Sequence, residues 1–286
     1  MSYWHTDYHS PHRGLCFEVS EVLHRKKSQY QQIEIVRTPS FGKVILLDGV
    51  LMLTEHDEFV YHEMLAHPAL FTHPDPRSVL IIGGGDCGTI RRVLEHKNVR
   101  RVVQVELDEM VTRVAGEHFP FPDIARSDPR AELLFADGIN FVQKCQEKFD
   151  VILIDSTDPV GPAEGLFRRP FFQDCHSILT DDGILCLQSE SPWIEELRKV
   201  IRDVHQDLAS LFPIVKVYGA AIQTYQAGLW LFQLASKKHN PLDPDIAGKI
   251  EAAGLETRYY HKDLHYGSFI LPKFVNEILS ESNTDS

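Results

Sequence analysis

The chain has 286 residues, of which 43% are hydrophobic and 24% are charged, and its formal net charge is −12. This length and composition allow one large and one small folded domain and exclude wholesale disorder. The acidic balance disfavours a general nucleic-acid binder, which needs clustered Lys and Arg to neutralise phosphate, whereas it suits a cationic substrate.

Three absences set expectations about the cellular location. The five cysteines form no C-x-x-C pair, and the first residues lack the apolar stretch of a secretion signal. The longest apolar runs are too short to span a membrane. We therefore expect a cytoplasmic protein with reduced thiols that binds neither nucleic acid nor membrane.

The first predicted elements are strands between residues 30 and 54. Two apolar runs, Lys43–Leu47 and Val50–Thr54, flank the pair Asp48-Gly49. Both residues of a two-residue hairpin turn need positive φ, so an Asp-Gly pair between apolar runs predicts a β-hairpin. We expect residues 1–57 to form a small N-terminal β-domain.

From about Arg77 the pattern changes to short apolar runs that alternate with helical segments. The predicted strands are Val79–Ile82, Val102–Val105, Glu132–Phe135, Val151–Ile154, Ile184–Leu187, Ile214–Tyr218 and Leu229–Leu234. Apolar residues at helical spacing between Ile194 and Leu208 indicate one of the helices. Strands that alternate with helices predict an α/β domain, here residues 58–286, with a parallel sheet covered on both faces.

A glycine-rich segment, Gly83–Gly88, directly follows the first of these strands. It matches the pattern G-x-G-x-x-G through Gly83, Gly85 and Gly88, and such glycines let the backbone approach a ligand closely. Glu106 ends the next strand, 18 residues after Gly88. A carboxylate at that place accepts hydrogen bonds from ribose hydroxyls, so the pattern predicts a nucleoside site.

Asp86 indicates which kind of nucleoside to expect. It lies inside the glycine loop, where the pyrophosphate of a dinucleotide would have to rest. A carboxylate there would repel pyrophosphate and attract a sulfonium or ammonium group. We therefore favour an S-adenosyl compound, with the alternative that Asp86 only caps the following helix.

Two more acidic segments follow predicted strands. Asp137-Gly138 could accept a hydrogen bond from an adenine amino group, or could be an ordinary helix N-cap. Asp155 and Asp158 follow the fourth strand, and ligands of open α/β sheets bind at the carboxyl ends of strands. With Asp86 they would place three carboxylates around one small volume, which would hold cations and raise the pKa of at least one acid. The alternative is a turn that satisfies backbone groups.

These segments together resemble the signatures of the spermidine synthases, the polyamine aminopropyltransferase family. The resemblance spans residues 20–275 and rests on Gly83–Gly88, Glu106, Asp137-Gly138, Asp155–Phe167 (DSTDPVGPAEGLF), Leu47–Glu63 (LDGVLMLTEHDEFVYHE), Tyr30-Gln31, Tyr259-Tyr260 and Phe269–Pro272. It implies a small β-domain followed by a class I methyltransferase-like Rossmann domain. It also implies transfer of an aminopropyl group from decarboxylated S-adenosylmethionine to putrescine, giving spermidine and 5'-methylthioadenosine, by a homodimer or homotetramer.

The resemblance assigns a role to each matching residue. The donor's nucleoside would contact Gln31, Gly83, Gly85, Glu106, Asp137, Gly138 and Pro162. Asp86 would bind the donor's ammonium, and Asp155 would accept the proton of the attacking amine. The amine site would comprise Tyr61, His62, Asp86, Asp155, Asp158, Glu190 and Tyr225, with Glu190 at the far ammonium. A sulfonium activates the adjacent carbon by itself, so we expect no metal and no cofactor.

Three departures from the family pattern concern the site. Cys87 stands where glycine is usual; its side chain could simply fill space, whereas an exposed thiol there could react with alkylating agents. Met52 replaces a commonly polar residue. The segment 222–226, IQTYQ, replaces the usual I-P-T-Y-P and shapes the amine pocket. Agmatine, cadaverine and spermidine are therefore alternative acceptors.

Two further readings keep the fold and change the function. The first is a methyltransferase that uses ordinary S-adenosylmethionine, which Asp86 disfavours because that donor carries a carboxylate. The second is an inactive nucleoside-binding or regulatory protein, which the presence of Asp155, Asp158 and Tyr61 disfavours.

Overall fold

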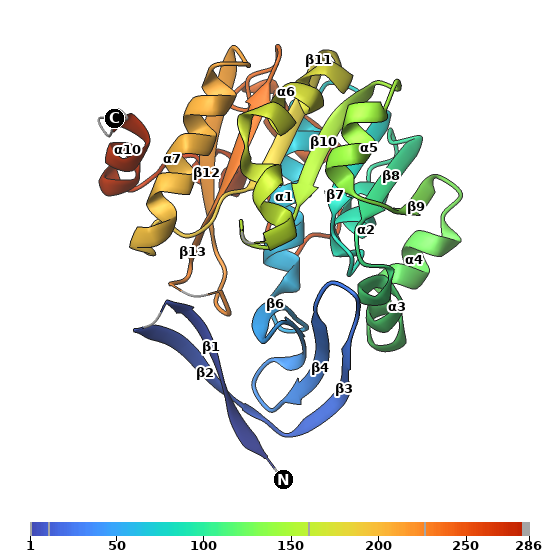
Figure 1. Ribbon diagram of the computed structural model, residues 1–286. Coiled ribbons are helices and arrows are strands. Elements are labelled where there is room, and N and C mark those ends of the chain that lie inside the picture. Colours follow the sequence, from blue (N-terminus) through green and yellow to red (C-terminus); the bar gives the residue numbers. More distant parts are fainter. Residues whose placement is uncertain (1, 11, 160, 226, 282–286) are drawn as a thin grey trace.

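The structure is a computed structural model that describes residues 2–10, 12–159, 161–225 and 227–281 (Figure 1). The strands are β1 Tyr3–Ser10, β2 Arg13–Val19, β3 Glu21–Lys27, β4 Gln32–Thr38, β5 Gly42–Leu47, β6 Val50–Thr54, β7 Ser78–Gly83, β8 Arg101–Glu106, β9 Ala131–Phe135, β10 Phe149–Asp155, β11 Leu179–Gln188, β12 Ile214–Ala221 and β13 Leu229–Ser236. The helices are α1 Glu58–Thr72, α2 Gly88–Leu94, α3 Glu109–His118, α4 Phe121–Ser127, α5 Gly138–Lys144, the 3-10 helix η1 Gly161–Phe167, α6 Arg169–Ile178, α7 Glu195–Ala209, α8 Asp245–Ala253, α9 Lys262–Gly267 and α10 Lys273–Ser280.

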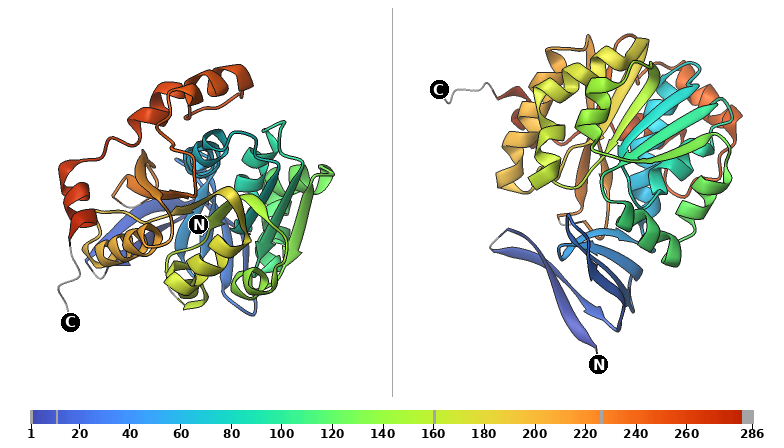
Figure 2. Two further views of the ribbon diagram at one scale, coloured as in Figure 1. Left: turned by 90° about the horizontal axis from the view of Figure 1, so that it is seen from above. Right: turned by 45° about the vertical axis from the view of Figure 1, so that its right-hand side comes forward.

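The N-terminal strands form two antiparallel sheets below the larger body of the molecule (Figures 1 and 2). β1 and β2 pair as a two-stranded ribbon, and β3–β6 form a four-stranded sheet. Asp48 and Gly49 join β5 to β6 with φ of 49° and 84°, which confirms the predicted hairpin. Strands before residue 30 were not expected, because β3 is polar and largely exposed and so lacks a buried face in its pattern.

The larger sheet has seven strands in the order β12-β13-β11-β10-β7-β8-β9. Its central strands are parallel, and β13 and β12 continue it in antiparallel fashion at one edge. Each strand predicted after Arg77 is present, and the α/β expectation is confirmed. The chain runs from β7 through β8 to β9 on one side and returns through β10 to β11 on the other. The strand order therefore reverses between β7 and β10, and this is where open α/β sheets bind ligands.

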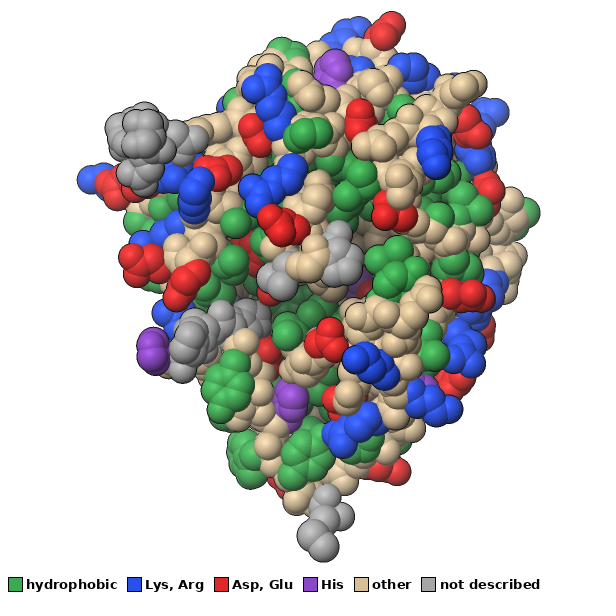
Figure 3. Space-filling model, viewed as in Figure 1, with side chains coloured by type: hydrophobic (Ala, Val, Ile, Leu, Met, Phe, Trp, Pro, Cys, Tyr) green, Lys and Arg blue, Asp and Glu red, His purple; other side chains and the backbone are tan. Residues whose placement is uncertain are grey.

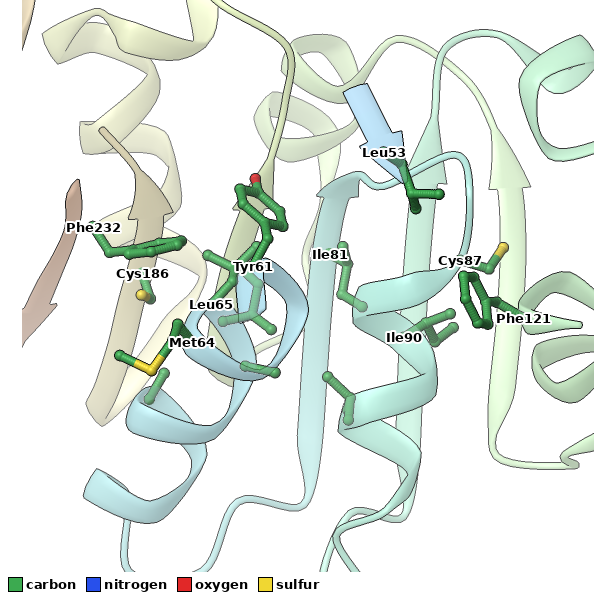
Figure 4. Close-up of a cluster of buried hydrophobic side chains, with 14 of the residues drawn as sticks. Leu53, Tyr61, Met64, Leu65, Ile81, Cys87, Ile90, Phe121, Cys186 and Phe232 are labelled. Atoms are coloured by element: carbon green, nitrogen blue, oxygen red, sulfur yellow. The ribbon is translucent and has the colours of Figure 1, made fainter. Parts of the chain in front are cut away.

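Alternate residues of the central strands bury against opposite helix layers. Ile81 contributes to the core under α1 and α2, whereas its neighbour Ile82 contributes to the core under α5, α6 and α7. Such two-residue alternation is the geometry of a pleated strand buried on both faces. Figure 4 shows the first core, in which Tyr61 and Met64 of α1 lie near Phe232 of β13.

α1 is buried from Val60 to Thr72, although it carries the polar residues His62, Glu63 and His67. It therefore lies inside the molecule, where it packs against α2 and the central strands. It follows directly on the N-terminal sheet and carries Tyr61 and His62 to the ligand-binding end of the large sheet. The fold thus brings two predicted site residues to the strand crossover.

Candidate active site

A cavity of about 470 Å³ opens at the carboxyl ends of β7, β8 and β10, with β5 and β6 of the N-terminal sheet on its other side. It is lined by most of the predicted site residues: Gln31, Tyr61, His62, Gly83, Gly85, Asp86, Glu106, Asp137, Gly138, Asp155, Asp158 and Tyr225. Pro162 belongs to η1, but its side chain lies outside the described part of the chain. Glu190 does not line this cavity, but Gln188, which donates to it, lines a small neighbouring pocket. All the predicted site residues except Pro162 and Glu190 therefore line one cavity.

One end of the cavity carries Glu106 and the residues around it. The backbone N–H of Asp108 donates to Oε1 of Glu106 over 2.8 Å. Burial, together with the negative charges of Asp108 and Asp155, raises the pKa of Glu106 to about 7. Gln31 reaches this end from the β3–β4 turn and donates through Nε2 to Asp108 over 3.1 Å. This end therefore offers carboxylate acceptors for hydroxyl donors such as those of a ribose.

Asp137 is both a helix N-cap and a residue of the cavity wall, the two alternatives that the sequence left open. Its Oδ1 accepts the backbone N–H of Asn140 over 2.9 Å and so caps α5, and the same residue lines the cavity. Gly138 follows it at the first position of α5, where a Cβ would lie 2.6 Å from Ile82. The close packing of α5 on β7 therefore requires glycine here and brings Asp137 to the rim of the site.

The glycine loop wraps directly around Asp155. The backbone N–H of Gly84 donates to the carbonyl of Asp155 over 2.8 Å. Gly84 has a φ of 69°, and a Cβ on it would lie 2.8 Å from Oδ2 of Asp155. Only glycine tolerates both constraints, so the loop lies against the carboxylate that ends β10.

Asp155 itself is buried and held by two hydroxyl groups. Tyr61 donates to Oδ1 over 2.9 Å, and Thr89 donates to Oδ2 over 2.6 Å. Burial and the neighbouring charge of Asp86 raise the pKa of Asp155, whereas His62, Thr89 and Tyr61 oppose this increase. A carboxylate with a raised pKa accepts a proton more readily than an ordinary aspartate, as a general base must.

His62 lies between two carboxylates. Its Nδ1 is 2.7 Å from Oε2 of Glu58, and its Nε2 is 3.3 Å from Oδ1 of Asp86. Burial lowers the pKa of the ring, but Asp86 and Glu58 outweigh burial and raise it to about 10. The resemblance placed His62 among the amine ligands, but the geometry turns both of its nitrogens toward acids.

Another part of the cavity wall carries Asp158 and Tyr225, and Glu190 lies behind it without lining the cavity. Tyr225 donates to the backbone carbonyl of Met52 over 2.8 Å, which fixes the ring at the wall. Glu190 is fully buried with a φ of 61°, and Gln188 donates to its Oε1 over 3.1 Å. Its Oε2 has no hydrogen-bond partner among the described residues. Burial and the charge of Asp158 raise the pKa of Glu190 well above its usual value.

A separate small pocket of about 30 Å³ shares Met52, Asp158 and Tyr225 with the cavity and is also lined by Gln188 and Trp230. A buried carboxylate oxygen without a partner is costly, and a cation or an ammonium donor would relieve that cost. Gln188 lines this pocket and donates to Glu190, so the pocket and the buried acid lie next to each other. Of the altered segment 222–226, Gln226 lies outside the described residues.

Cys87 is fully buried, so of the two alternatives its side chain fills space and its thiol is not exposed. Burial and the charge of Asp86 raise the pKa of the thiol to about 12, which keeps it protonated. Its backbone has a φ of 65° at the start of α2, where a left-handed residue closes the glycine loop. The side chain belongs to the same buried hydrophobic cluster as Ile90 and Phe121 (Figure 4).

Sequence reasoning missed Thr89, Glu58 and Arg91, although each contacts a predicted site residue directly or through one neighbour. Thr89 follows the glycine motif by one position, and nothing in its local pattern signals a contact with Asp155. Glu58 and His62 are spaced i, i+4 on one helix, which was a usable signal for a pair. Arg91 comes from α2 and meets Glu58 only in the folded structure.

The chain matches two family models. A model described as the spermine/spermidine synthase domain matches residues 58–244, and one described as the spermidine synthase tetramerisation domain matches residues 3–55. The chain belongs to the spermine/spermidine synthase family. This membership makes it a transferase of the aminopropyltransferase class.

Curated and solved relatives agree with this assignment. The polyamine aminopropyltransferase of Clostridium perfringens (strain 13 / Type A) is 42% identical over 279 residues, 98% of each chain. That of Thermoanaerobacter pseudethanolicus is 43% identical over 281 residues, 98% of this chain and 100% of the relative. A spermidine synthase solved with the transition-state analogue AdoDATO superposes with a TM-score of 0.92 at 38% identity, covering 97% of this chain and 94% of that one. The spermidine synthase of Thermotoga maritima gives 0.88 at 37% identity, with coverages of 96% and 94%.

Two surface observations complete the description. Within the described residues, no helix is both long and apolar enough to cross a membrane. Figure 3 shows Lys and Arg side chains interspersed with Asp and Glu over the face in view. Neither sign of charge dominates that face.

Proposed function

We propose that the protein transfers the aminopropyl group of decarboxylated S-adenosylmethionine to putrescine, giving spermidine and 5'-methylthioadenosine. The observation that carries the proposal is the shared cavity of Asp86, Asp155 and Asp158, with Glu106 and Asp137 at its other end. Three carboxylates beside a nucleoside site suit two cationic reactants, and ordinary S-adenosylmethionine would bring its own carboxylate against Asp86. The family to which the chain belongs supports the same reaction.

The proposed roles follow the two ends of the cavity. The donor's adenosine contacts Gln31, Glu106 and Asp137, and the donor's ammonium contacts Asp86. The acceptor lies between Asp155 and the buried Glu190, with Tyr225 beside it. The unpartnered Oε2 of Glu190 supports this placement, because a diamine has a second ammonium that could donate to it.

The chemical step needs a deprotonated amine. A primary alkylamine titrates near pKa 10.4 like lysine, so removing its proton near pH 7.5 costs about 4 kcal/mol. Asp155 accepts that proton, and its raised pKa reduces the mismatch. The amine nitrogen then forms a bond to the carbon next to the sulfonium, the carbon–sulfur bond breaks, and its electron pair leaves with neutral methylthioadenosine. Placing both reactants in one cavity supplies much of the remaining acceleration.

Product analysis with a panel of amines tests the proposal. The protein is incubated with decarboxylated S-adenosylmethionine and putrescine, agmatine, cadaverine or spermidine, and products are identified by mass spectrometry. We expect spermidine from putrescine at the highest kcat/KM. Preference for another amine would overturn the acceptor assignment, and absence of transfer to every amine would overturn the reaction.

A thermal-shift comparison tests the donor separately. Decarboxylated S-adenosylmethionine should raise the Tm more than ordinary S-adenosylmethionine does, because Asp86 attracts one and repels the carboxylate of the other. A larger shift with ordinary S-adenosylmethionine would favour a methyltransferase instead.

We further propose a cytoplasmic homodimer or homotetramer that needs no metal or cofactor. We propose that residues 1–57 form a domain that contributes to the interface between copies, and that residues 58–286 form the catalytic domain. Trp4 and Tyr8 of β1 support it, because they are 70% and 68% exposed on the ribbon and offer an aromatic surface to another copy. Light scattering after size exclusion measures the assembly, and a monomer would contradict it.

A further inference from the structure

His62 is enclosed so tightly that its ionisation state follows from its contacts. Only 3% of its side chain is exposed, and its two ring nitrogens face Glu58 and Asp86 over 2.7 and 3.3 Å. A carboxylate oxygen accepts and does not donate, so a ring with acids at both nitrogens carries a proton on each. An imidazolium cannot accept a hydrogen bond from a substrate ammonium, and its charge would repel one.

Glu58 also forms an ion pair with Arg91. One nitrogen of the guanidinium lies 3.0 Å from each oxygen of the Glu58 carboxylate. The guanidinium carbon lies 4.3 Å from the ring centre of Phe121, and the same ring meets His62 edge-on. Glu58 is 8% exposed and Arg91 is 19% exposed, so solvent screens this pair much less than a surface ion pair. Charges therefore alternate from Arg91 through Glu58 and His62 to Asp86.

The loop that carries Asp86 packs directly against His62. Oδ1 of Asp86 accepts the backbone N–H of Gly88 over 2.7 Å and also faces His62. A Cβ at Gly88 would collide with Cε1 of His62, so the loop lies directly on the imidazole ring. Both contacts use Oδ1 and leave Oδ2 for a ligand of the cavity.

We propose that His62 is a positioning residue, and that Arg91, Glu58 and His62 together fix the orientation and charge of the carboxylate at Asp86 that receives the donor's ammonium. This inference rests on the proposed function, since it concerns how the decarboxylated donor is bound. It replaces the direct amine contact that the resemblance gave to His62. It also assigns a role to Glu58 and Arg91, which lie outside the substrate cavity.

The arrangement explains how the site keeps two acids close together. Asp86 raises the pKa of Asp155 and His62 lowers it, so the imidazolium offsets the repulsion between these carboxylates. The charged or titratable groups around the ring and its partner Glu58 are Glu58 and Tyr61 on α1, Asp86 in the loop, Arg91 and Arg92 on α2, and Asp155 at the end of β10. Removing the charge of Glu58 would lower the pKa of His62 and free Asp86 from its partner at alkaline pH.

The test is Glu58→Gln, which keeps the shape of the side chain and removes its charge. Affinities for decarboxylated S-adenosylmethionine and for methylthioadenosine are measured by calorimetry at pH 7 and pH 9. We expect the variant to bind the decarboxylated donor about tenfold more weakly than wild type at pH 9 and less so at pH 7, a loss typical of one charge-assisted hydrogen bond. Methylthioadenosine lacks the ammonium and should bind both proteins equally.

Controls separate positioning from general damage. Glu132→Gln removes a surface carboxylate that pairs with Arg101 and should change neither affinity. Asp86→Asn should show the largest loss of affinity for decarboxylated S-adenosylmethionine, because it removes the carboxylate itself. His62→Gln can donate to Asp86 but carries no charge, so its loss should be the same at pH 7 and pH 9. If Glu58→Gln does not fold, Arg91→Gln is measured in its place and should show a smaller loss in the same direction.

An NMR titration of ¹⁵N-labelled imidazoles gives a readout that does not depend on turnover. His62 should stay protonated to about pH 9 in wild type and lose its proton at lower pH in Glu58→Gln. An unchanged titration, equal affinities at both pH values, or an equal loss for both ligands would overturn the inference. A wild-type protein that neither binds the decarboxylated donor nor transfers its aminopropyl group would instead overturn the proposed function.

Discussion

The hydroxyl of Thr89 donates to Oδ2 of Asp155 over 2.6 Å, at a position where no part of the threonine is exposed. Tyr61 donates to the other oxygen, so the proposed base has one fixed donor on each side. Hydrogen bonds to an ionised carboxylate favour that form and limit how far burial can raise its pKa. The hydroxyl groups of Thr89 and Tyr61 therefore determine both the orientation of the Asp155 carboxylate and its basicity.

Thr89→Val should remove the hydrogen bond to Oδ2 of Asp155 while keeping the shape of the side chain. Without the donor, the pKa of Asp155 rises further, so protonation disables the base at a higher pH. We expect kcat to fall by about tenfold and the acidic limb of its pH profile to move upward. Thr89→Ser keeps a hydroxyl and should retain the wild-type profile. A valine variant whose pH profile superposes on that of wild type would contradict the role of Thr89.

Asp155→Asn should separate binding from chemistry. The amide keeps the size of the side chain but cannot accept the amine's proton, so turnover should fall by about 10² to 10⁴. Methylthioadenosine should still bind, because its proposed contacts are at Glu106 and Asp137. Single-turnover kinetics and calorimetry measure the two effects. Near-normal turnover would refute the role as base.

Much of this site could be predicted from the sequence, because strand ends and turns carry local signals. Glu106, Asp137 and Asp155 each follow an apolar run, and the topology brings the carboxyl ends of those runs together. Thr89 and Arg91 carry no such signal, since their partners come from other elements, 66 and 33 residues away in the chain. The ionisation state of His62 likewise depends on how α1 packs against the glycine loop.

Strands with a buried face could be predicted from the sequence, whereas an exposed strand could not. Strands with one or two buried faces show a pattern of apolar residues, and each of those predicted after Arg77 is present. β3 has almost no buried face, and its sequence, EVLHRKK, contains charged residues that are typical of exposed strands. Its pairing with β4 is therefore set by the neighbouring strand and not by its own pattern.

Binding of methylthioadenosine should depend on pH through Glu106, whose pKa is about 7 without ligand. Ribose hydroxyls that donate to the carboxylate favour its ionised form, so binding lowers the pKa and releases a proton. Affinity should therefore rise from about pH 5 to about pH 7 and then level off. Calorimetry in buffers of different ionisation enthalpy measures the released proton. Glu106→Gln should bind more weakly and without this slope, and a flat profile in wild type would contradict the contact.

Cys87 should resist alkylation, because its thiol is buried and its pKa is raised to about 12 by burial and the charge of Asp86. Cys16 is exposed and provides an internal reference. After brief treatment of the native protein with iodoacetamide, peptide mass spectrometry should find Cys16 modified and Cys87 intact. Modification of both at similar rates would show that the glycine loop opens readily to solvent.

The backbone at Cys87 stores strain that a pair of variants can measure. Its φ of 65° is unfavourable for any residue with a Cβ, by roughly 1–2 kcal/mol, whereas glycine adopts it freely. Cys87→Gly and Cys87→Ala both lose the buried thiol and its contact with Gln104, so their difference isolates the backbone. Glycine also gains entropy in the unfolded chain, which offsets part of the relief. We expect the free energy of unfolding in urea to be about 1 kcal/mol larger for Cys87→Gly than for Cys87→Ala. Equal values would mean that the loop relaxes around the side chain, and the left-handed geometry would then have no energetic consequence.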